Sequence, residues 1–333
     1  METSVLKVDP TNPESDVIGR AAAVIRSGGL VAFPTETVYG LGAKGLSAEA
    51  VAGIFNAKGR PSTNPLILHV SDASEVLNVA ADWPATAQTL AARFWPGPLT
   101  LVVPKRDSVP HIVTAGGPTV AVRCPNHAVA RALIRAAGVP LAAPSANRST
   151  ELSPTHAGHV LKGLNGRIAM VLDGGRCSGG LESTVVDVTG EIPRMLRPGL
   201  ITVPMLEAVC GRVEVGAKSE GVARAPGQMA KHYSPRTPLA LCATPTDALT
   251  SAARARAQGQ NAWIMAPDSK EFDQLDEGAD ILSALPERYG AELYDVLHMI
   301  DGAEHDIVFV VLPPDTPEWA AVRDRLTRAA ARE

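Results

Sequence analysis

Short apolar runs alternate with amphipathic segments along most of this chain, and this alternation restricts the fold more than any other feature. Residues 12–27 and 128–137 place apolar side chains at helical spacing, whereas residues 30–33 and 119–123 form short apolar runs typical of buried strands. This mixed order of helices and strands predicts an α/β fold. Several predicted strands follow one another without an intervening helix, so we expect a twisted, mixed sheet rather than a purely parallel one.

The pattern breaks at residues 214–237, which are rich in Gly, Ala, Lys, Ser and Pro and show little periodicity. Such a composition predicts a linker. Beyond it, a strand followed by a helix recurs three times, which predicts a small, Rossmann-like parallel α/β domain. We therefore expect a larger domain over residues 1–213, a linker over 214–237 and a C-terminal domain over 238–333.

Composition excludes several classes of protein. The 31 Lys and Arg residues are outnumbered by 35 Asp and Glu residues, and the net charge of -4 disfavours nucleic-acid binding as the main activity. Cys124, Cys177, Cys210 and Cys242 form no Cys-x-x-Cys motif, so we expect buried thiols in a reducing compartment. The chain shows neither an apolar signal-peptide core nor a run of about 20 apolar residues, so we expect a cytoplasmic protein without membrane attachment.

The stretch GLGAKG at residues 40–45 fits the dinucleotide-binding pattern G-x-G-x-x-G, but its context fails. Residues 34–39 separate these glycines from the predicted strand, and position 60 is Arg rather than an acidic residue. We therefore predict a tight turn. The P-loop pattern G-x-x-x-x-G-K-[ST] is also absent from the sequence, so ATP would have to bind in another way.

Polar and cationic side chains gather where predicted helices and strands end. Lys58 and Arg60 flank a glycine at a helix end, and residues 62–64 add a row of donors that suits a polyphosphate. A plainer interpretation is that the two cations only offset the helix dipole. Arg123 ends an apolar strand and needs an anionic partner, which is either a protein carboxylate or a ligand carboxylate.

Other polar groups allow two interpretations each. Residues 34–40 combine two hydroxyls and a carboxylate, which fits a ligand pocket or a local turn equally well. His69 within a predicted strand is more often a core residue than a ligand. Residues 142–148, AAPSANR, combine small residues with donors at a strand end. No Cys/His or Ser/His/Asp set stands out, so the pattern indicates a site that positions anionic ligands and stabilises charge.

Taken in order, these motifs resemble the threonylcarbamoyl-AMP synthases in their longer, two-domain form with a YrdC-like N-terminal domain. The resemblance covers most of the chain and includes the K-x-R and S-x-N signature, here Lys58/Arg60 and Ser145/Asn147. It rests on VAFPTETVYGLGA at 31–43, KGRPSTNPLILHV at 58–70, FWPGPLTLVV at 94–103, TVAVRCPNH at 119–127, PLAAPSANRS at 140–149, ESTVVDVT at 182–189, LRPG at 196–199 and APGQMAKHYSPRTPL at 225–239.

The resemblance implies an enzyme that converts L-threonine, bicarbonate or carbon dioxide, and ATP into threonylcarbamoyl-AMP and pyrophosphate. Magnesium would be carried by ATP and pyrophosphate, with no metal site made by protein side chains. The product would pass to downstream transfer machinery that modifies tRNAs reading codons that begin with A, and a weak direct RNA contact is left open. Two alternatives are a carbamoyl-transfer domain, disfavoured by the lack of Cys-x-x-Cys, and an RNA-binding module, disfavoured by the acidic charge.

The resemblance also implies roles for individual residues. Lys58 and Arg60 would be catalytic because they stabilise the charge of the leaving pyrophosphate. Tyr233, in the linker, would help close the site as a lid. Arg148 after the S-x-N motif departs from the family pattern, and so do Gln228 and Ser234 in the linker. The residues implied to bind threonine are Thr35, Thr37, His69, Arg123, Ala143 and Ser183, and those implied to bind ATP are Lys58, Arg60, Asn64, Thr119, Ser145, Asn147, Ser153, Arg197 and Tyr233.

Overall fold

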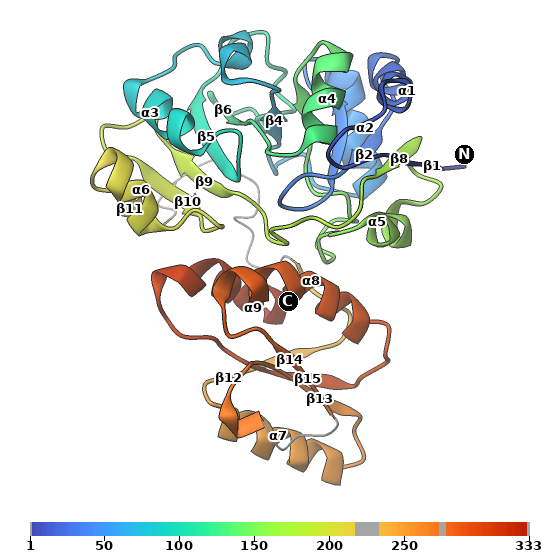
Figure 1. The fold of residues 1–333 in the computed structure, drawn as a ribbon, viewed down its shortest axis with the longest axis vertical. Coiled ribbons are helices and arrows are strands. Elements are labelled where there is room, and N and C mark those ends of the chain that lie inside the picture. Colours follow the sequence, from blue (N-terminus) through green and yellow to red (C-terminus); the bar gives the residue numbers. More distant parts are fainter. Residues whose placement is uncertain (1, 217–232, 273–277, 332–333) are drawn as a thin grey trace. The chain divides into compact units, whose positions relative to one another are not determined.

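The computed structural model describes residues 2–216, 233–272 and 278–331, which form two compact units (Figure 1). The described residues of the first unit are 2–149, 153–178 and 182–216. The second contains the remainder, including two short segments at Thr150–Leu152 and Gly179–Leu181. None of the described helices is both long and apolar enough to cross a bilayer.

The first unit is built on a large mixed sheet, as the alternation of apolar runs predicts. Its strand order is β1-β8-β2-β3-β7-β4-β6-β5-β9-β10-β11, with parallel and antiparallel neighbours interspersed. The strands are β1 Ser4–Lys7, β2 Val31–Phe33, β3 Gly40–Lys44, β4 Ile67–His69, β5 Leu99–Pro104, β6 Thr119–Arg123, β7 Leu141–Ala142, β8 Met170–Asp173, β9 Thr184–Asp187, β10 Arg194–Arg197 and β11 Glu214–Val215.

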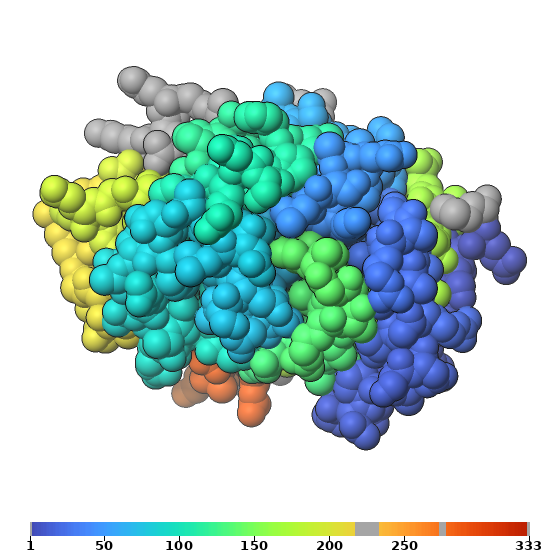
Figure 2. All heavy atoms as spheres, turned by 90° about the horizontal axis from the view of Figure 1, so that it is seen from above, coloured from blue at the N-terminus to red at the C-terminus, as the bar shows by residue number. Residues whose placement is uncertain are grey.

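Alternation along the strands separates the two larger cores of the first unit. Val31 and Phe33 pack with helices α1 and α4, whereas Ala32 belongs to the opposite core with α2. Figure 2 shows α4 beside α1 on one face of this unit, where the two helices are in contact. The helices are α1 Ser15–Arg26, α2 Ala48–Lys58, α3 Ala85–Phe94, α4 Ala128–Ala137, α5 Ala157–Leu164 and α6 Val203–Cys210, with a 3-10 helix at Ala73–Asn78.

The glycine-rich stretch Gly40–Lys44 is strand β3, so the predicted tight turn is wrong. It pairs with β2 on one side and with β7 on the other. A Cβ atom at Gly42 would lie 2.8 Å from Cε1 of Phe33, so the aromatic ring packs directly on the glycine backbone. The turn prediction followed from the failed context of the dinucleotide-binding pattern, and glycine is also depleted in strands in general. Here close packing of a neighbouring ring overrides that preference.

Other differences involve short elements at the margins of the sheet. Strand β1 has largely exposed residues and shows no apolar run, so the sequence pattern did not predict it. Glu214–Val215 pairs with β10, so the sheet continues into the first residues of the expected linker. Residues 217–232 of that linker lie outside the described residues, and the domain limits expected from the sequence stay a prediction.

The second unit contains the parallel sheet expected from its strand–helix repeat. The strand order is β12-β15-β13-β14, and all neighbours are parallel. Strand β14 was not predicted. The elements are β12 Leu239–Cys242, α7 Pro245–Ala257, β13 Ala262–Pro267, β14 Ala279–Leu282, α8 Pro286–Ile300, β15 Ile307–Val311 and α9 Ala320–Ala330, with 3-10 helices at Lys270–Phe272 and Pro317–Trp319.

The cysteines are free thiols, as expected. Cys124, Cys177 and Cys242 are buried and Cys210 is half-buried. Burial raises the pKa of Cys177 to about 12 and that of Cys124 to about 11, so both thiols stay protonated at neutral pH.

Candidate active site

A row of polar side chains crosses the strands β4, β6 and β5 on one face of the sheet. The parallel register places His69 beside Arg123, and the antiparallel register Leu101↔Val122 places Thr100 opposite Arg123. Two residues away on each of these strands lie the apolar residues Ile67, Ala121 and Val102, which form a small buried cluster with Val185 and Leu196. Because alternate residues of a strand share a face, this apolar cluster lies next to the polar row on the same face of the sheet.

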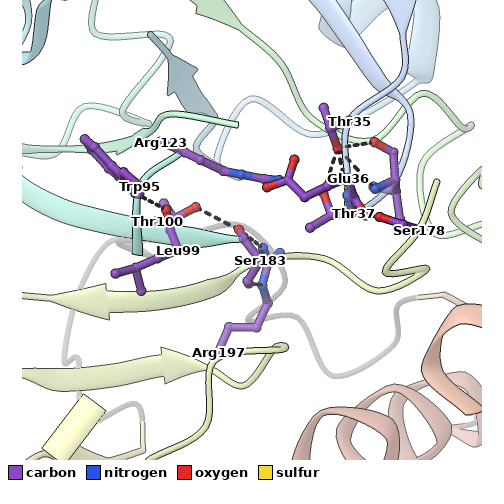
Figure 3. Close-up of polar contacts among 11 residues, drawn as sticks. Thr35, Glu36, Thr37, Trp95, Leu99, Thr100, Arg123, Ser178, Ser183 and Arg197 are labelled. Atoms are coloured by element: carbon purple, nitrogen blue, oxygen red, sulfur yellow. Dashed lines mark hydrogen bonds and ion pairs between the residues drawn. The ribbon is translucent and has the colours of Figure 1, made fainter. Parts of the chain in front are cut away.

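Arg123 extends from β6 toward Glu36 in the loop after β2 (Figure 3). Its Nη2 lies 2.7 Å from Oε1 of Glu36, and the side chains are only 5% and 10% exposed. The contact is an ion pair and does not count as a hydrogen bond. Within the described residues, neither carboxylate oxygen of Glu36 has a hydrogen-bond partner, and neither have Nε and Nη2 of Arg123. The sequence left the anionic partner of Arg123 open, and the structure identifies a protein carboxylate.

The loop that carries Glu36 is fixed by its own hydroxyls. The Thr35 hydroxyl donates to the Val38 carbonyl at 2.7 Å and accepts from the Thr37 amide at 3.1 Å. The hydroxyls of Thr35 and Thr37 are 2.8 Å apart. Because Thr35 donates to Val38, Thr37 is the donor between the two hydroxyls. The stretch is therefore a local turn, one of the two interpretations that the sequence allowed, and this turn also presents Glu36 to Arg123.

His69 lies in this row as a neutral imidazole. Burial, and to a lesser extent the nearby Arg123 cation, lower its pKa from 6.5 to about 3. Its ring packs edge-on against Phe33, with 6.5 Å between ring centroids. Nδ1 of His69 is buried and has no hydrogen-bond partner in the described parts of the chain. Three neighbouring side chains of the first unit thus hold unused hydrogen-bonding capacity away from water.

Ser183 continues the polar row beyond Thr100, and the two hydroxyls are 2.7 Å apart. Arg197 on β10 fixes Ser183 from the other side. Its Nε and Nη2 donate to the Ser183 carbonyl at 3.1 and 3.0 Å, and Nη2 donates to the hydroxyl at 3.2 Å. Ser183 was predicted to bind threonine and Arg197 to bind ATP, and the structure brings the two into direct contact (Figure 3).

The two signature motifs also meet. Lys58 ends helix α2, whose N-terminus is capped by Ser47 and which stops at Gly59 with φ 64°. The Lys58 ammonium donates to the carbonyl of Ser145 at 2.6 Å, to the carbonyl of Asn147, and to Oδ1 of Asn147 at 3.2 Å. These three acceptors match the three N–H groups of an ammonium. Lys58 was expected to contact phosphates, whereas here it holds the S-x-N turn.

Arg60 makes a similar internal arrangement. Its Nε donates to the carbonyl of Asn64 at 3.3 Å and its Nη2 donates to the carbonyl of Pro65 at 3.0 Å, so the guanidinium closes its own loop. A Cβ atom at Gly59 would lie 3.3 Å from Nη2 of Arg148, which places the family departure Arg148 directly beside the K-x-R motif. Cationic groups therefore gather around Gly59.

The remaining predicted residues are placed as follows. The Ala143 amide donates to the Ile67 carbonyl at 3.0 Å, which ties β7 to β4. The Ser153 hydroxyl donates to Oε1 of buried Glu182 at 2.5 Å. Thr119 starts β6, on the same face as Arg123 but at the other end of the strand. These residues do not lie in the polar row of His69 and Arg123.

Tyr233 belongs to the second unit and is almost fully buried there. Its ring centroid lies 5.9 Å from that of Tyr294 and 5.1 Å from the Arg325 guanidinium carbon. The predicted roles of Tyr233 as an ATP ligand and as part of a lid stay predictions.

Comparison with known proteins places these motifs in a family. Residues 23–199 match the family described as telomere recombination, and residues 201–331 match the C-terminal domain of threonylcarbamoyl-AMP synthase. The protein named threonylcarbamoyl-AMP synthase in Bacillus subtilis is 41% identical over 332 residues, which cover 97% of this chain and 95% of that protein. The chain belongs to the threonylcarbamoyl-AMP synthase family.

Other members agree in sequence and in fold. The threonylcarbamoyl-AMP synthase of Pyrococcus abyssi is 39% identical, with 93% of each chain covered. The crystal structure of Pyrococcus abyssi Sua5 complexed with L-threonine matches with a TM-score of 0.91 at 38% identity, over 98% of both chains. The expected fold and the resemblance to threonylcarbamoyl-AMP synthases are thereby confirmed.

Within this threonylcarbamoyl-AMP synthase fold, the sequence analysis gave Glu36 no role of its own and missed Thr100. Glu36 lies between the two threonines that were selected, and a carboxylate between two hydroxyls was the available signal. Thr100 gave no signal, because its contact with Ser183 joins residues 83 positions apart.

Proposed function

We propose that this chain condenses L-threonine, bicarbonate or carbon dioxide, and ATP into threonylcarbamoyl-AMP, with release of pyrophosphate. The observation that carries the proposal is the buried set of Glu36, His69 and Arg123, whose hydrogen-bonding capacity is incompletely used among the described residues. Buried polar groups are nearly always satisfied, so such a cluster is typical of a site completed by a ligand. The threonine complex of Pyrococcus abyssi Sua5 supports L-threonine as that ligand.

The amino-acid half of the site would bind by charge and by hydroxyl contacts. The Arg123 guanidinium offers two N–H groups to the carboxylate of threonine. Ser183 and Thr37 are hydroxyl groups suited to the threonine side chain, since hydroxyls both donate and accept. The neutral amine of threonine would then attack carbon dioxide with loss of a proton, or bicarbonate with loss of water, to give a carbamate. A carbamate is unstable in water, so burial of the amino-acid half favours its survival.

The nucleotide half would bind ATP with its magnesium as one substrate. Lys58, Arg60 and Arg148 gather positive charge around Gly59, which suits the phosphates and the leaving pyrophosphate. Magnesium prefers oxygen ligands and usually stays on phosphate oxygens with few protein ligands. The side chains named around Gly59 are cations, which fits a metal carried by the nucleotide rather than by the protein. Attack of a carbamate oxygen on the α-phosphorus would break its bond to pyrophosphate and form the mixed anhydride.

The product is a reactive acyl adenylate, so a downstream transferase must consume it. We propose that it serves the modification of tRNAs that read codons beginning with A, in the cytoplasm. Direct contact with RNA is not needed for synthesis of the adenylate, and the net charge of -4 gives no general attraction for phosphate backbones.

Pyrophosphate release tests the proposal. Purified full-length protein with ATP, magnesium and bicarbonate should release pyrophosphate only when L-threonine is added, and the adenylate should appear by mass spectrometry. L-Serine, L-valine and L-allothreonine serve as matched amino-acid controls. Pyrophosphate release that is independent of threonine, or no release at all, would refute the proposed function.

A further inference from the structure

The Glu36 carboxylate is a buried anion with no assigned role in the reaction. Its side chain is 10% exposed and lies 2.7 Å from Nη2 of Arg123. Yet both of its oxygens lack a hydrogen-bond partner in the described residues. A buried carboxylate normally accepts several hydrogen bonds, and leaving these unmade costs free energy. The ion pair alone therefore does not complete the surroundings of Glu36.

The backbone around Glu36 is held in place from both sides. The Thr35 hydroxyl closes the turn by bonding to the Val38 carbonyl. The Ser178 hydroxyl donates to the carbonyl of Glu36 itself at 3.4 Å. With the backbone fixed, the carboxylate is preorganised next to Arg123, a condition that increases the affinity of a site for a matching ligand.

The two side chains present opposite charges next to each other, and a free α-amino acid does the same with its carboxylate and ammonium groups. His69 is neutral, since burial lowers its pKa to about 3, and the Lys58 ammonium is bonded to the turn at residues 145–147. Arg123 thus supplies the positive charge of this group of side chains, and Glu36 supplies the negative charge.

We propose that Glu36 binds the α-ammonium group of L-threonine while Arg123 binds its carboxylate, so that the amino acid completes both partners of the Glu36–Arg123 ion pair. Glu36 is then the residue that selects amino acids over hydroxy acids and holds the nitrogen that must be carboxylated. This inference rests on the proposed function, and it adds a recognition element for the reacting amine.

A simpler role for Glu36 would be to orient Arg123 without touching the ligand. The two roles differ in what happens with a ligand that lacks the amine. (R)-3-Hydroxybutanoate keeps the carboxylate and the hydroxyl of L-threonine and lacks only the ammonium group. If Glu36 acts only through Arg123, its loss weakens the binding of both ligands equally. If it binds the ammonium group, its loss weakens the binding of L-threonine alone.

Calorimetric titration of the full-length protein with both ligands makes this test. We expect Glu36→Gln to raise the Kd of L-threonine about 10- to 100-fold, the effect of losing a hydrogen bond to a charged group. The Kd of (R)-3-hydroxybutanoate should stay the same or fall, because the ligand carboxylate no longer meets the negative charge of Glu36. The preference of the protein for L-threonine over the hydroxy acid should therefore collapse. An equal loss for both ligands, or no change in the preference, overturns the inference.

Two further variants secure the result. Asp187→Asn removes another buried carboxylate of the first unit, one that accepts from the amide and hydroxyl of Thr189, and it should leave the ligand preference unchanged. If Glu36→Gln does not fold, Glu36→Asp keeps the charge with a shorter reach. It should weaken the binding of L-threonine more than that of the hydroxy acid, and an equal effect on both overturns the inference.

Failure of the proposed function and failure of this inference give different results. If wild-type protein shows no threonine-dependent pyrophosphate release, the proposed function fails. Normal release with an equal loss of affinity for both ligands in Glu36→Gln refutes only the role of Glu36.

Discussion

The two halves of the candidate active site differ in how completely their polar groups are paired. In the amino-acid half, Glu36, Arg123 and His69 are buried with hydrogen-bonding capacity that the described residues leave unused. In the nucleotide half, the Lys58 ammonium has three oxygen acceptors from the S-x-N turn, and Arg60 bonds to two carbonyls of its own loop. The first half is arranged to receive a ligand, whereas the second is internally bonded.

This difference has consequences for binding. A small amino acid can enter the first half and satisfy groups that already lack partners, so its binding needs little rearrangement. Phosphates can interact with Lys58 or Arg60 in two ways. The cations can attract the phosphate charge while they keep their bonds to protein carbonyls, or they can give up a carbonyl acceptor and bond to a phosphate oxygen instead. The exchange breaks existing bonds, so we expect the nucleotide half to change its side-chain contacts when ATP binds. Each of the following predictions tests this contrast.

The largest effect is expected for Lys58→Met, which removes the charge but keeps much of the side-chain volume. Turnover should fall about 1000-fold, within the range seen when a cation is removed from a phosphoryl-transfer site. The Kd of L-threonine should stay within about threefold, because the amino-acid half is complete without Lys58. Pyrophosphate release and threonine titration measure the two quantities. Lys105→Met is the matched control, since Lys105 also donates to a backbone carbonyl but lies outside both motifs. A parallel loss of threonine affinity in Lys58→Met would show that the two halves are not separable.

The sequence selected residues in both halves, but it did not predict which side chains contact each other. Ordered motifs selected Lys58, Asn147 and Arg123, and strand periodicity predicted the mixed sheet that carries them. The contact between Lys58 and Asn147 joins positions 89 residues apart, and spacing in the sequence has no means of predicting such a pair. The partner of Arg123 was open for the same reason, because it depends on where the loop after β2 lies relative to β6.

The error at β3 has a different physical cause. Local preference argued against a strand through Gly40 and Gly42, and the deciding contact was the ring of Phe33 packed on the glycine backbone. Local preference is weaker than such packing, so the element became clear only once its neighbours in the sheet were known.

Arg123→Gln should have the next largest effect, on the amino-acid half alone. The substitution removes the proposed partner of the threonine carboxylate and leaves the buried Glu36 charge uncompensated, so the Kd of L-threonine should rise about 100-fold or more. ATP affinity, measured separately with a non-hydrolysable analogue, should change little. Arg194→Gln is the control, because it breaks the more exposed ion pair with Glu214. Exposed pairs contribute about 1 kcal/mol or less to the stability of the fold, so this variant should keep its threonine affinity. Equal losses of ATP and threonine affinity in Arg123→Gln would contradict the division into two halves.

The smallest expected effect concerns pH and tests whether His69 stays neutral beside Arg123 in the amino-acid half. The folded-state pKa of His69 is lowered to about 3 from 6.5, so between these values the unfolded chain binds a proton that the folded chain excludes. The stability contributed by neutral His69 is complete above pH 6.5 and is lost as pH falls, by about 2 kcal/mol at pH 5. His69→Gln should therefore reduce the difference in unfolding free energy between pH 7.5 and pH 5 by about this amount, measured by urea denaturation. The exposed His111, replaced by Gln, provides the control. If His69→Gln retains the full pH dependence of the wild type, His69 accepts a proton in the folded protein, and the amino-acid half then holds a second cation beside Arg123 at acidic pH.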